Sequence, residues 1–184
     1  MRTLKLVILS AALAAAPLSL AFAGGAGGVT WSNQHAVFGL PTSTLSVSSV
    51  GGFGYGVSPG GTRTGGFGFA LYSVPGGDSL SGGVGGFIVG QEGHAGPFTA
   101  AVNLWTGLGG VSATMAGVET GALVLFGEAN VELGAAVTPW MQLVLYGGVQ
   151  GLADVSPGHG IGSQILSYAP VIGMRLAWGS FGTH

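Results

Sequence analysis

The chain has 184 residues, of which only 5% are charged, and its four Lys and Arg are outnumbered by six Asp and Glu. With a mean hydropathy of +0.61, the sequence holds too few charges to cover an ordinary water-facing surface and has no basic footprint for nucleic acid. Cysteine is absent, which excludes disulfides, thiol catalysis and cysteine-ligated metals.

Residues 1–23 have the pattern of a secretory signal peptide. Arg2 and Lys5 precede an apolar run, and Ala21-Phe22-Ala23 is a small-residue cleavage site, so we expect cleavage after Ala23. Residues 24–44 have no clean periodicity and are interpreted as an N-terminal lead-in segment. After the leader, no apolar run approaches the ~20 residues that a membrane-spanning helix needs.

Alternation with a period of two predicts the strands. In chain order they are expected at 45–57, 66–71, 80–90, 98–105, 111–115, 122–137, 141–152 and 164–178, followed by a tail at 179–184. One bulged strand over 98–117 competes with the two strands predicted there. Turns at 75–78, 108–110 and 138–140 are expected on the side of both termini, and longer loops at 58–65, 91–97 and 154–162 on the other side.

The hairpin of residues 122–152 gives the clearest pattern. Leu123, Leu125, Val131 and Leu133 share one face of its first strand, which carries no charge, while the other face carries Glu128, Asn130 and Glu132. Gln142 and Gln150 occupy the corresponding polar face of the second strand. An apolar exterior around a polar lumen is the arrangement of a membrane β-barrel. We therefore predict an all-β, antiparallel, up-and-down transmembrane β-barrel of eight strands over residues 45–178.

The last strand carries a motif that resembles the β-signal of bacterial outer-membrane β-barrels. Gly173, Leu176 and Trp178 stand at its glycine, apolar and aromatic positions, although Val171 replaces the polar residue and six residues follow Trp178. The chain thus resembles the small eight-stranded, OmpA-like barrels of the bacterial outer membrane. The resemblance implies outer-membrane lipid as surroundings and insertion by the barrel assembly machinery. Aromatic residues at strand ends are expected in a girdle at the membrane interfaces: Tyr55, Trp105, Trp140 and Trp178.

The charged residues on the predicted strands are Glu128, Glu132 and Arg175, all expected to face the lumen. Because an eight-stranded barrel is narrow, Arg175 and Glu132 are expected to form a structural ion pair across it. Two alternatives stay open. Gly52, Gly54, Gly56, Gly66 and Gly68, interpreted as inward-facing, leave room for a water-filled conducting path. A catalytic carboxylate pair is disfavoured because no His is expected on the same face.

The four histidines, His35, His94, His159 and His184, all fall outside the predicted strands. His94 and His159 are placed in outward loops, where a metal site is conceivable but solvated histidines are commoner. His159 and Ser163 resemble only faintly the His and Ser of outer-membrane lipid A deacylases. No metal and no cofactor is expected.

The function expected is therefore that of an integral outer-membrane β-barrel with a structural, adhesive or narrow-pore role and no catalysis. A secreted glycine-rich fibre or matrix subunit is one alternative, because glycine contributes 39 residues. A lipid-modifying barrel enzyme is the other. No nucleic-acid partner is expected.

Overall fold

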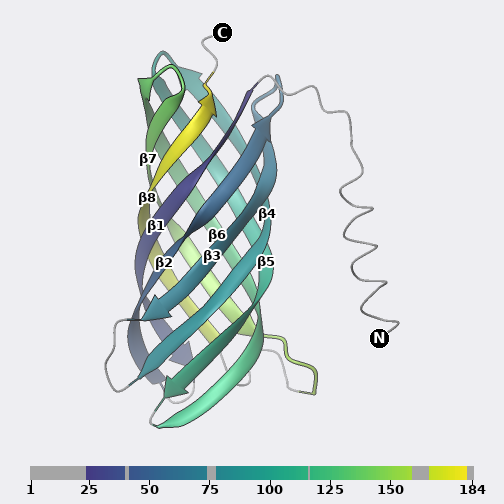
Figure 1. Ribbon diagram of the computed structural model, residues 1–184, viewed down its shortest axis with the longest axis vertical. Coiled ribbons are helices and arrows are strands. Elements are labelled where there is room, and N and C mark those ends of the chain that lie inside the picture. The colour runs from purple at the N-terminus through teal and green to yellow at the C-terminus, as the bar shows by residue number, and fades with distance from the viewer. Residues whose placement is uncertain (1–23, 40–41, 74–77, 116, 159–165, 182–184) are drawn as a thin grey trace.

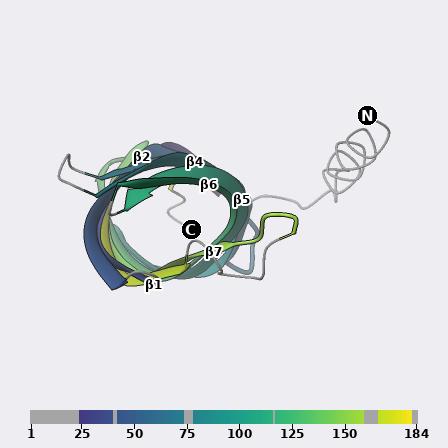
Figure 2. The same cartoon turned by 90° about the horizontal axis from the view of Figure 1, so that it is seen from below.

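The computed structural model describes residues 24–39, 42–73, 78–115, 117–158 and 166–181. It is a closed barrel in which each strand pairs antiparallel with the next and the last pairs with the first (Figures 1 and 2). The strands are β1 Gly24–Gly39, β2 Thr42–Val57, β3 Thr62–Ser73, β4 Ser79–Ala95, β5 Phe98–Met115, β6 Val118–Thr138, β7 Met141–Asp154 and β8 Leu166–Ser180. In these described ranges no helix is long and apolar enough to cross a membrane.

Side chains alternate between the lumen and the exterior, as β6 illustrates. Glu128 and Glu132 are buried inside the barrel, whereas Val131 and Leu133 are 54% and 67% exposed on its outer surface. Large apolar side chains are exposed in the same way on the other strands, among them Val29, Phe87, Leu104, Leu145 and Ile172. An apolar exterior with the charged side chains inside is the arrangement of a transmembrane β-barrel, as predicted.

The barrel has two distinct ends. We call the end where β1 begins and β8 finishes the terminal end, and the opposite end the loop end (Figure 1). Tight turns at 58–61, 96–97 and 139–140 join strands at the terminal end. The chain passes from β1 to β2, β3 to β4, β5 to β6 and β7 to β8 at the loop end.

The interior toward the loop end is filled with aromatic and aliphatic side chains. Phe53, Phe67, Phe69, Trp105 and Phe126, which we call the aromatic cluster, pack with ring centroids 4.7–6.0 Å apart. Beyond them lie Leu71, Leu80, Val111, Val124 and Leu152, all buried. In the described residues, the buried side chains of this half pack against one another as a core.

Two differences from the eight predicted strands cancel in the strand count, since one strand was missed and one was divided into two. Residues 24–39, predicted as a lead-in, form β1, which pairs with both β2 and β8. Residues 98–115 form the single strand β5, which bears out the one-strand alternative, although neither of its ladders contains a bulge. Leu108-Gly109-Gly110 lies within this strand, paired with β4 and β6. The apolar phase shifts at Val111 because the lumen changes from polar to apolar at that depth, and the chain does not turn there.

The same two errors placed several connections at the wrong end. Residues 58–65 and 91–97 were expected opposite the termini, but both stretches lie at the terminal end, and the β3-to-β4 connection lies at the loop end. The turn at 138–140 is at the terminal end, as expected. Because successive connections alternate between the two ends, missing β1 assigned every later connection to the opposite end. Dividing β5 into two strands then restored the correct end for the connections that follow it.

The inward and outward faces of β2 and β3 are also reversed relative to the prediction. Phe53, Phe67 and Phe69 point into the barrel and are buried, while Gly52 and Gly68 lie on the exposed outer face. Gly54, Gly56 and Gly66 have the same outward parity, so none of these glycines leaves space in the lumen. A strand in which apolar residues alternate with glycine has no charged face. Its sequence therefore does not show which of its two faces lies inside the barrel.

Candidate functional site

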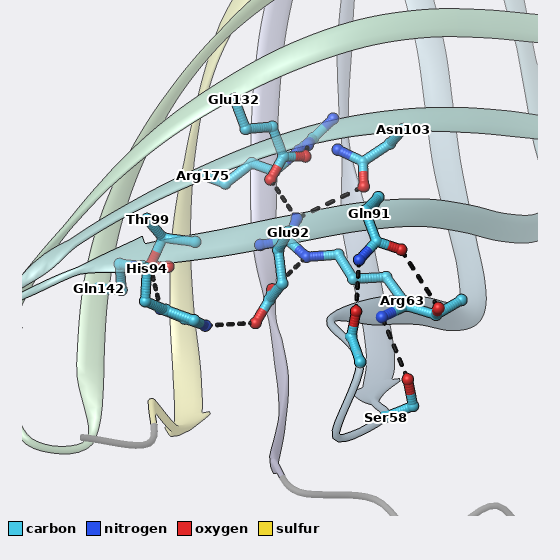
Figure 3. Close-up of polar contacts among 12 residues, drawn as sticks. Ser58, Arg63, Gln91, Glu92, His94, Thr99, Asn103, Glu132, Gln142 and Arg175 are labelled. Atoms are coloured by element: carbon cyan, nitrogen blue, oxygen red, sulfur yellow. Dashed lines mark hydrogen bonds and ion pairs between the residues drawn. The ribbon is translucent and has the colours of Figure 1, made fainter. Parts of the chain in front are cut away.

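Five ionisable side chains from different strands meet inside the barrel toward the terminal end. Arg63 on β3, Glu92 on β4, Glu128 and Glu132 on β6 and Arg175 on β8 have side chains at most 5% exposed. We call this group the ion cluster (Figure 3 draws its contacts at the Arg63 side). Its formal charge is two guanidinium groups minus three carboxylates, or −1.

Glu132 lies between the two arginines. Its Oε2 accepts a hydrogen bond from Nη1 of Arg63 at 2.6 Å, and its Oε1 pairs with Nη1 of Arg175. Arg175 also donates from Nη2 to Oε1 of Glu128 at 3.3 Å, and Nδ2 of Asn130 donates to that same oxygen at 2.5 Å. The pair expected between Arg175 and Glu132 is present, but as part of a larger network.

The Arg175 guanidinium connects the ion cluster to the aromatic cluster. Its Cζ atom lies 3.8 Å from the ring centroid of Tyr146 and 4.1 Å from that of Trp105. A cation stacked on aromatic faces away from water is attracted by the ring quadrupole. The two clusters are therefore in contact inside the barrel, and we call them together the plug.

A second chain of hydrogen bonds leads from the ion cluster to the terminal end. Glu92 accepts from Nε of Arg63 at 2.5 Å through Oε2, and its Oε1 lies 2.6 Å from Nε2 of His94. The other ring nitrogen of His94, Nδ1, lies 3.0 Å from Oγ1 of Thr99, and Nε2 of Gln142 donates to that hydroxyl at 2.8 Å. We call Glu92, His94, Thr99 and Gln142 the mouth relay (Figure 3).

The mouth relay borders a cavity of about 720 Å³ at the terminal end. The turn between β4 and β5, the turn between β6 and β7, and the end of β8 form its walls. The lining residues are His94, Gly96, Pro97, Thr99, Ala136, Thr138, Pro139, Gln142, Ser180 and Phe181. The wall is mostly apolar, and the relay supplies hydroxyl, imidazole and amide groups at its inner edge.

Sequence reasoning missed three members of this site, Arg63, Glu92 and His94, because it placed them in loops. The structure extends β4 to Ala95 and begins β3 at Thr62, so all three point inward from strands. The sequence did contain a signal, because residues separated by an even number of positions in a strand face the same side. Arg63 stands in this way to the buried Phe67 and Phe69. Glu92 and His94 stand in this way to the buried Val84 and Ile88. The premise that no histidine shares a face with a carboxylate is therefore wrong for His94.

The other predicted residues divide between the lumen and the exterior. Asn130, Gln142 and Gln150 are buried in the lumen, as expected. The girdle prediction is wrong for Trp105, which is 1% exposed in the aromatic cluster, and for Tyr55, whose ring stacks on Phe53 and lies under Arg63. Both rings pack against aromatic side chains and an arginine inside the barrel, and these contacts replace the membrane interface that the prediction assigned to them. Trp140 and Trp178 are exposed at the terminal end.

The β-signal residues lie in β8. Gly173 is covered by the ring of Tyr146, and Trp178 pairs with Met141 across the β7–β8 ladder. The signal peptide, His159, Ser163 and His184 lie outside the described residues, so the predictions about them stay predictions. For His35, only the backbone, in β1, is described.

Comparison with known proteins gives a similarity of fold. No family model matches the chain, and no curated protein gives a significant sequence match. The crystal structure of Neisserial surface protein A (NspA) is similar, with a TM-score of 0.60 and 11% sequence identity over 83% of this chain and 96% of that chain. The chain therefore shares its closed antiparallel barrel with that surface protein.

Proposed function

We propose that this protein is an integral outer-membrane β-barrel whose plugged lumen makes it a structural, non-conducting component of the membrane. The observation that carries the proposal is the plug of the ion and aromatic clusters inside an apolar shell. The sequence pattern of a signal peptide, cleaved after Ala23, and the β-signal support export and insertion by the barrel assembly machinery.

The distribution of charge supports a membrane location. Six of the eight Asp, Glu and Arg residues in the described part of the chain have buried side chains inside the barrel, and the other two, Asp78 and Glu119, are at the loop end. Between the two ends the described exterior carries no Asp, Glu, Lys or Arg and is mostly apolar, as lipid contact favours. By the usual rule of short periplasmic turns, the terminal end with its tight turns faces the periplasm.

The packing of the lumen argues against the narrow-pore alternative. Trp105 and Arg175 stack on each other at mid-height, and both side chains are almost fully buried. A water-filled path would have to displace Trp105 or break the ion cluster, and both changes would cost several kcal/mol. The protein therefore works as an anchor or surface-presenting element and not as a channel.

The alternative of a secreted glycine-rich fibre subunit is disfavoured because the sheet closes on itself as a barrel. A subunit that assembles by strand stacking needs an unpaired sheet edge, and here β1 and β8 pair with each other. The expectation of no catalysis stays a prediction, although His94 lies beside the carboxylate of Glu92.

Single-channel recording in planar lipid bilayers tests the proposal. The refolded protein should shift on unheated gels as a folded barrel does and should give no stepwise current. A Phe67→Gly/Trp105→Gly variant, which removes two rings of the plug, should conduct. Steady conductance by the unmodified protein, or partition of the folded protein into the aqueous phase, would refute it.

A further inference from the structure

We propose that the mouth relay is a hydrolytic site in which Thr99 attacks carboxylic esters and His94 acts as its general base. This activity goes beyond the structural role proposed above, and it rests on the juxtaposition of a hydroxyl, an imidazole and a carboxylate beside a cavity at the terminal end.

The hydrogen-bond directions around His94 fit this role. A carboxylate can only accept, so Nε2 of His94 carries the hydrogen that bonds to Oε1 of Glu92 at 2.6 Å. In the neutral imidazole Nδ1 then has a free lone pair, and the Thr99 hydroxyl donates to it at 3.0 Å. A nucleophile bound to a base that a third group orients is the recurring signature of covalent catalysis. The tautomer is assigned from these partners.

Glu92 is itself held in place, so it can serve as the positioning residue. Its second oxygen accepts from Nε of Arg63 at 2.5 Å, and its side chain is 5% exposed. The carboxylate therefore cannot turn away from His94 without losing a buried ion pair. Its negative charge would stabilise the imidazolium that forms when His94 takes the proton from Thr99.

Gln142 supplies the donor that acyl transfer needs. Its Nε2 lies 2.8 Å from Oγ1 of Thr99 and the residue is buried at the inner edge of the cavity. A donor at that position lies close to the carbonyl oxygen of an ester whose carbon approaches Thr99. Fixed donors at the site of developing oxyanion charge are a major source of catalysis in acyl transfer.

The cavity defines the substrate class. Pro97, Ala136, Pro139 and Phe181 make most of its wall apolar, and its volume of about 720 Å³ is that of a small-molecule site. Apolar walls with a few polar groups at one edge fit an uncharged ester whose acyl chain lies against Phe181. The cavity is bordered by the turns of the terminal end, so a substrate would enter from the aqueous side there.

The reaction balances with water as the second reactant. The Thr99 oxygen bonds to the ester carbonyl carbon while its proton moves to Nδ1 of His94. The carbon–oxygen bond to the alcohol then breaks, and the alcohol leaves with that proton. Water next attacks the acyl-threonine, His94 accepts its proton and returns it to Oγ1, and the carboxylic acid is released.

The test uses the full chain refolded in detergent, with p-nitrophenyl butyrate as substrate and a fluorophosphonate as a covalent probe. We expect turnover above the detergent blank and probe attached to Thr99 in a peptide map. Thr99→Val and His94→Gln should each lower kcat/KM by about 100-fold or more, whereas Thr99→Ser should retain turnover. Thr106→Val is the matched control, since Thr106 is on the same strand but faces outward, and should leave turnover unchanged.

Glu92→Asp separates positioning from folding. It keeps the charge that Arg63 requires but shortens the reach to His94, so kcat should fall while KM stays the same. All variants are compared after their folded, heat-modifiable gel band is confirmed, and Thr99→Ser and His94→Gln carry the test if Thr99→Val does not fold. Absence of turnover and labelling in the unmodified protein, equal turnover in folded Thr99→Val or His94→Gln, or probe on a different residue would overturn the proposal.

Discussion

Replacing Arg175 with Met is the sharpest test of the ion cluster. The Arg175 side chain is 1% exposed and its guanidinium contacts the carboxylates of Glu128 and Glu132. Removal changes the formal charge of the cluster from −1 to −2, because Arg63 alone then faces three carboxylates. Glu132→Gln changes it instead to zero, and the amide oxygen can still accept from Arg63.

The expected magnitudes follow from these contacts. Breaking a buried pair by deleting one partner costs about 3–5 kcal/mol, and loss of cation stacking on Tyr146 and Trp105 adds about 1 kcal/mol. Arg175→Met should therefore lower the free energy of unfolding by about 4–6 kcal/mol. Glu132→Gln should cost about 1–3 kcal/mol, the cost of a weakened buried hydrogen bond.

Equilibrium unfolding in urea, with the barrel in phospholipid vesicles and followed by tryptophan fluorescence, measures both losses. The double variant should lose at least about 1 kcal/mol less than the sum of the single losses, because the two residues share one interaction. Additive losses, or a Glu132→Gln variant less stable than Arg175→Met, would refute this account of the cluster.

Three further predictions use the same unfolding measurement. Val131→Arg, on the exterior near the middle of β6, should cost about 2–4 kcal/mol, whereas Val118→Arg at the end of that strand should cost about 0–1 kcal/mol; equal small losses would indicate a water-covered exterior. Trp105→Ala should cost about 3–5 kcal/mol, because it empties the centre of the aromatic cluster, and a loss below about 1 kcal/mol would show that this packing is not stabilising. Gly86→Ala should be destabilising because its Cβ would collide with the carbonyl oxygen of Thr106. Gly68→Ala should be neutral, since its Cβ meets nothing within 4 Å. Equal effects of the two variants would contradict the close approach of β4 to β5 at Gly86.

The C-terminal half of the fold could be predicted because its strands carry polar residues on one face. In β6 and β7, Glu128, Glu132 and Gln142 mark the lumen, and a single charge near the bilayer centre is costly enough to fix the register. The exterior of these strands follows at once. The predicted barrel architecture is confirmed, and the Arg175–Glu132 pair lies where the alternation placed it.

The N-terminal half resisted prediction because it lacks that marker. In β2 and β3, apolar residues alternate with glycine or serine, and either face could have been turned to lipid. The interior there is aromatic, so the usual rule that a barrel lumen is polar misassigned Phe53 and Phe67. In β1 the stretch Gly24–Gly28 leaves almost no side chains to read, and its strand conformation depends on pairing with β2 and β8.

The mouth relay could not be predicted from spacing, because it depends on three-dimensional pairing. His94 and Thr99 lie opposite each other in the β4–β5 ladder across the turn at Gly96 and Pro97. Gln142 comes from a strand 43 residues further along. The prediction ended this strand at residue 90 and placed 91–97 in a loop, so it could not bring Glu92 and His94 together with Thr99 and Gln142.

Pairing of the first strand with the last has a consequence for how the protein is made. Gly25 lies opposite Ser180, so the barrel cannot close until the chain has been synthesised as far as Ser180. Before that moment β1 and β8 each present an open edge, and contacts so distant in sequence form slowly. Deletion of either terminal strand should therefore leave a chain that associates with other copies through its exposed edges instead of maturing into a shorter barrel.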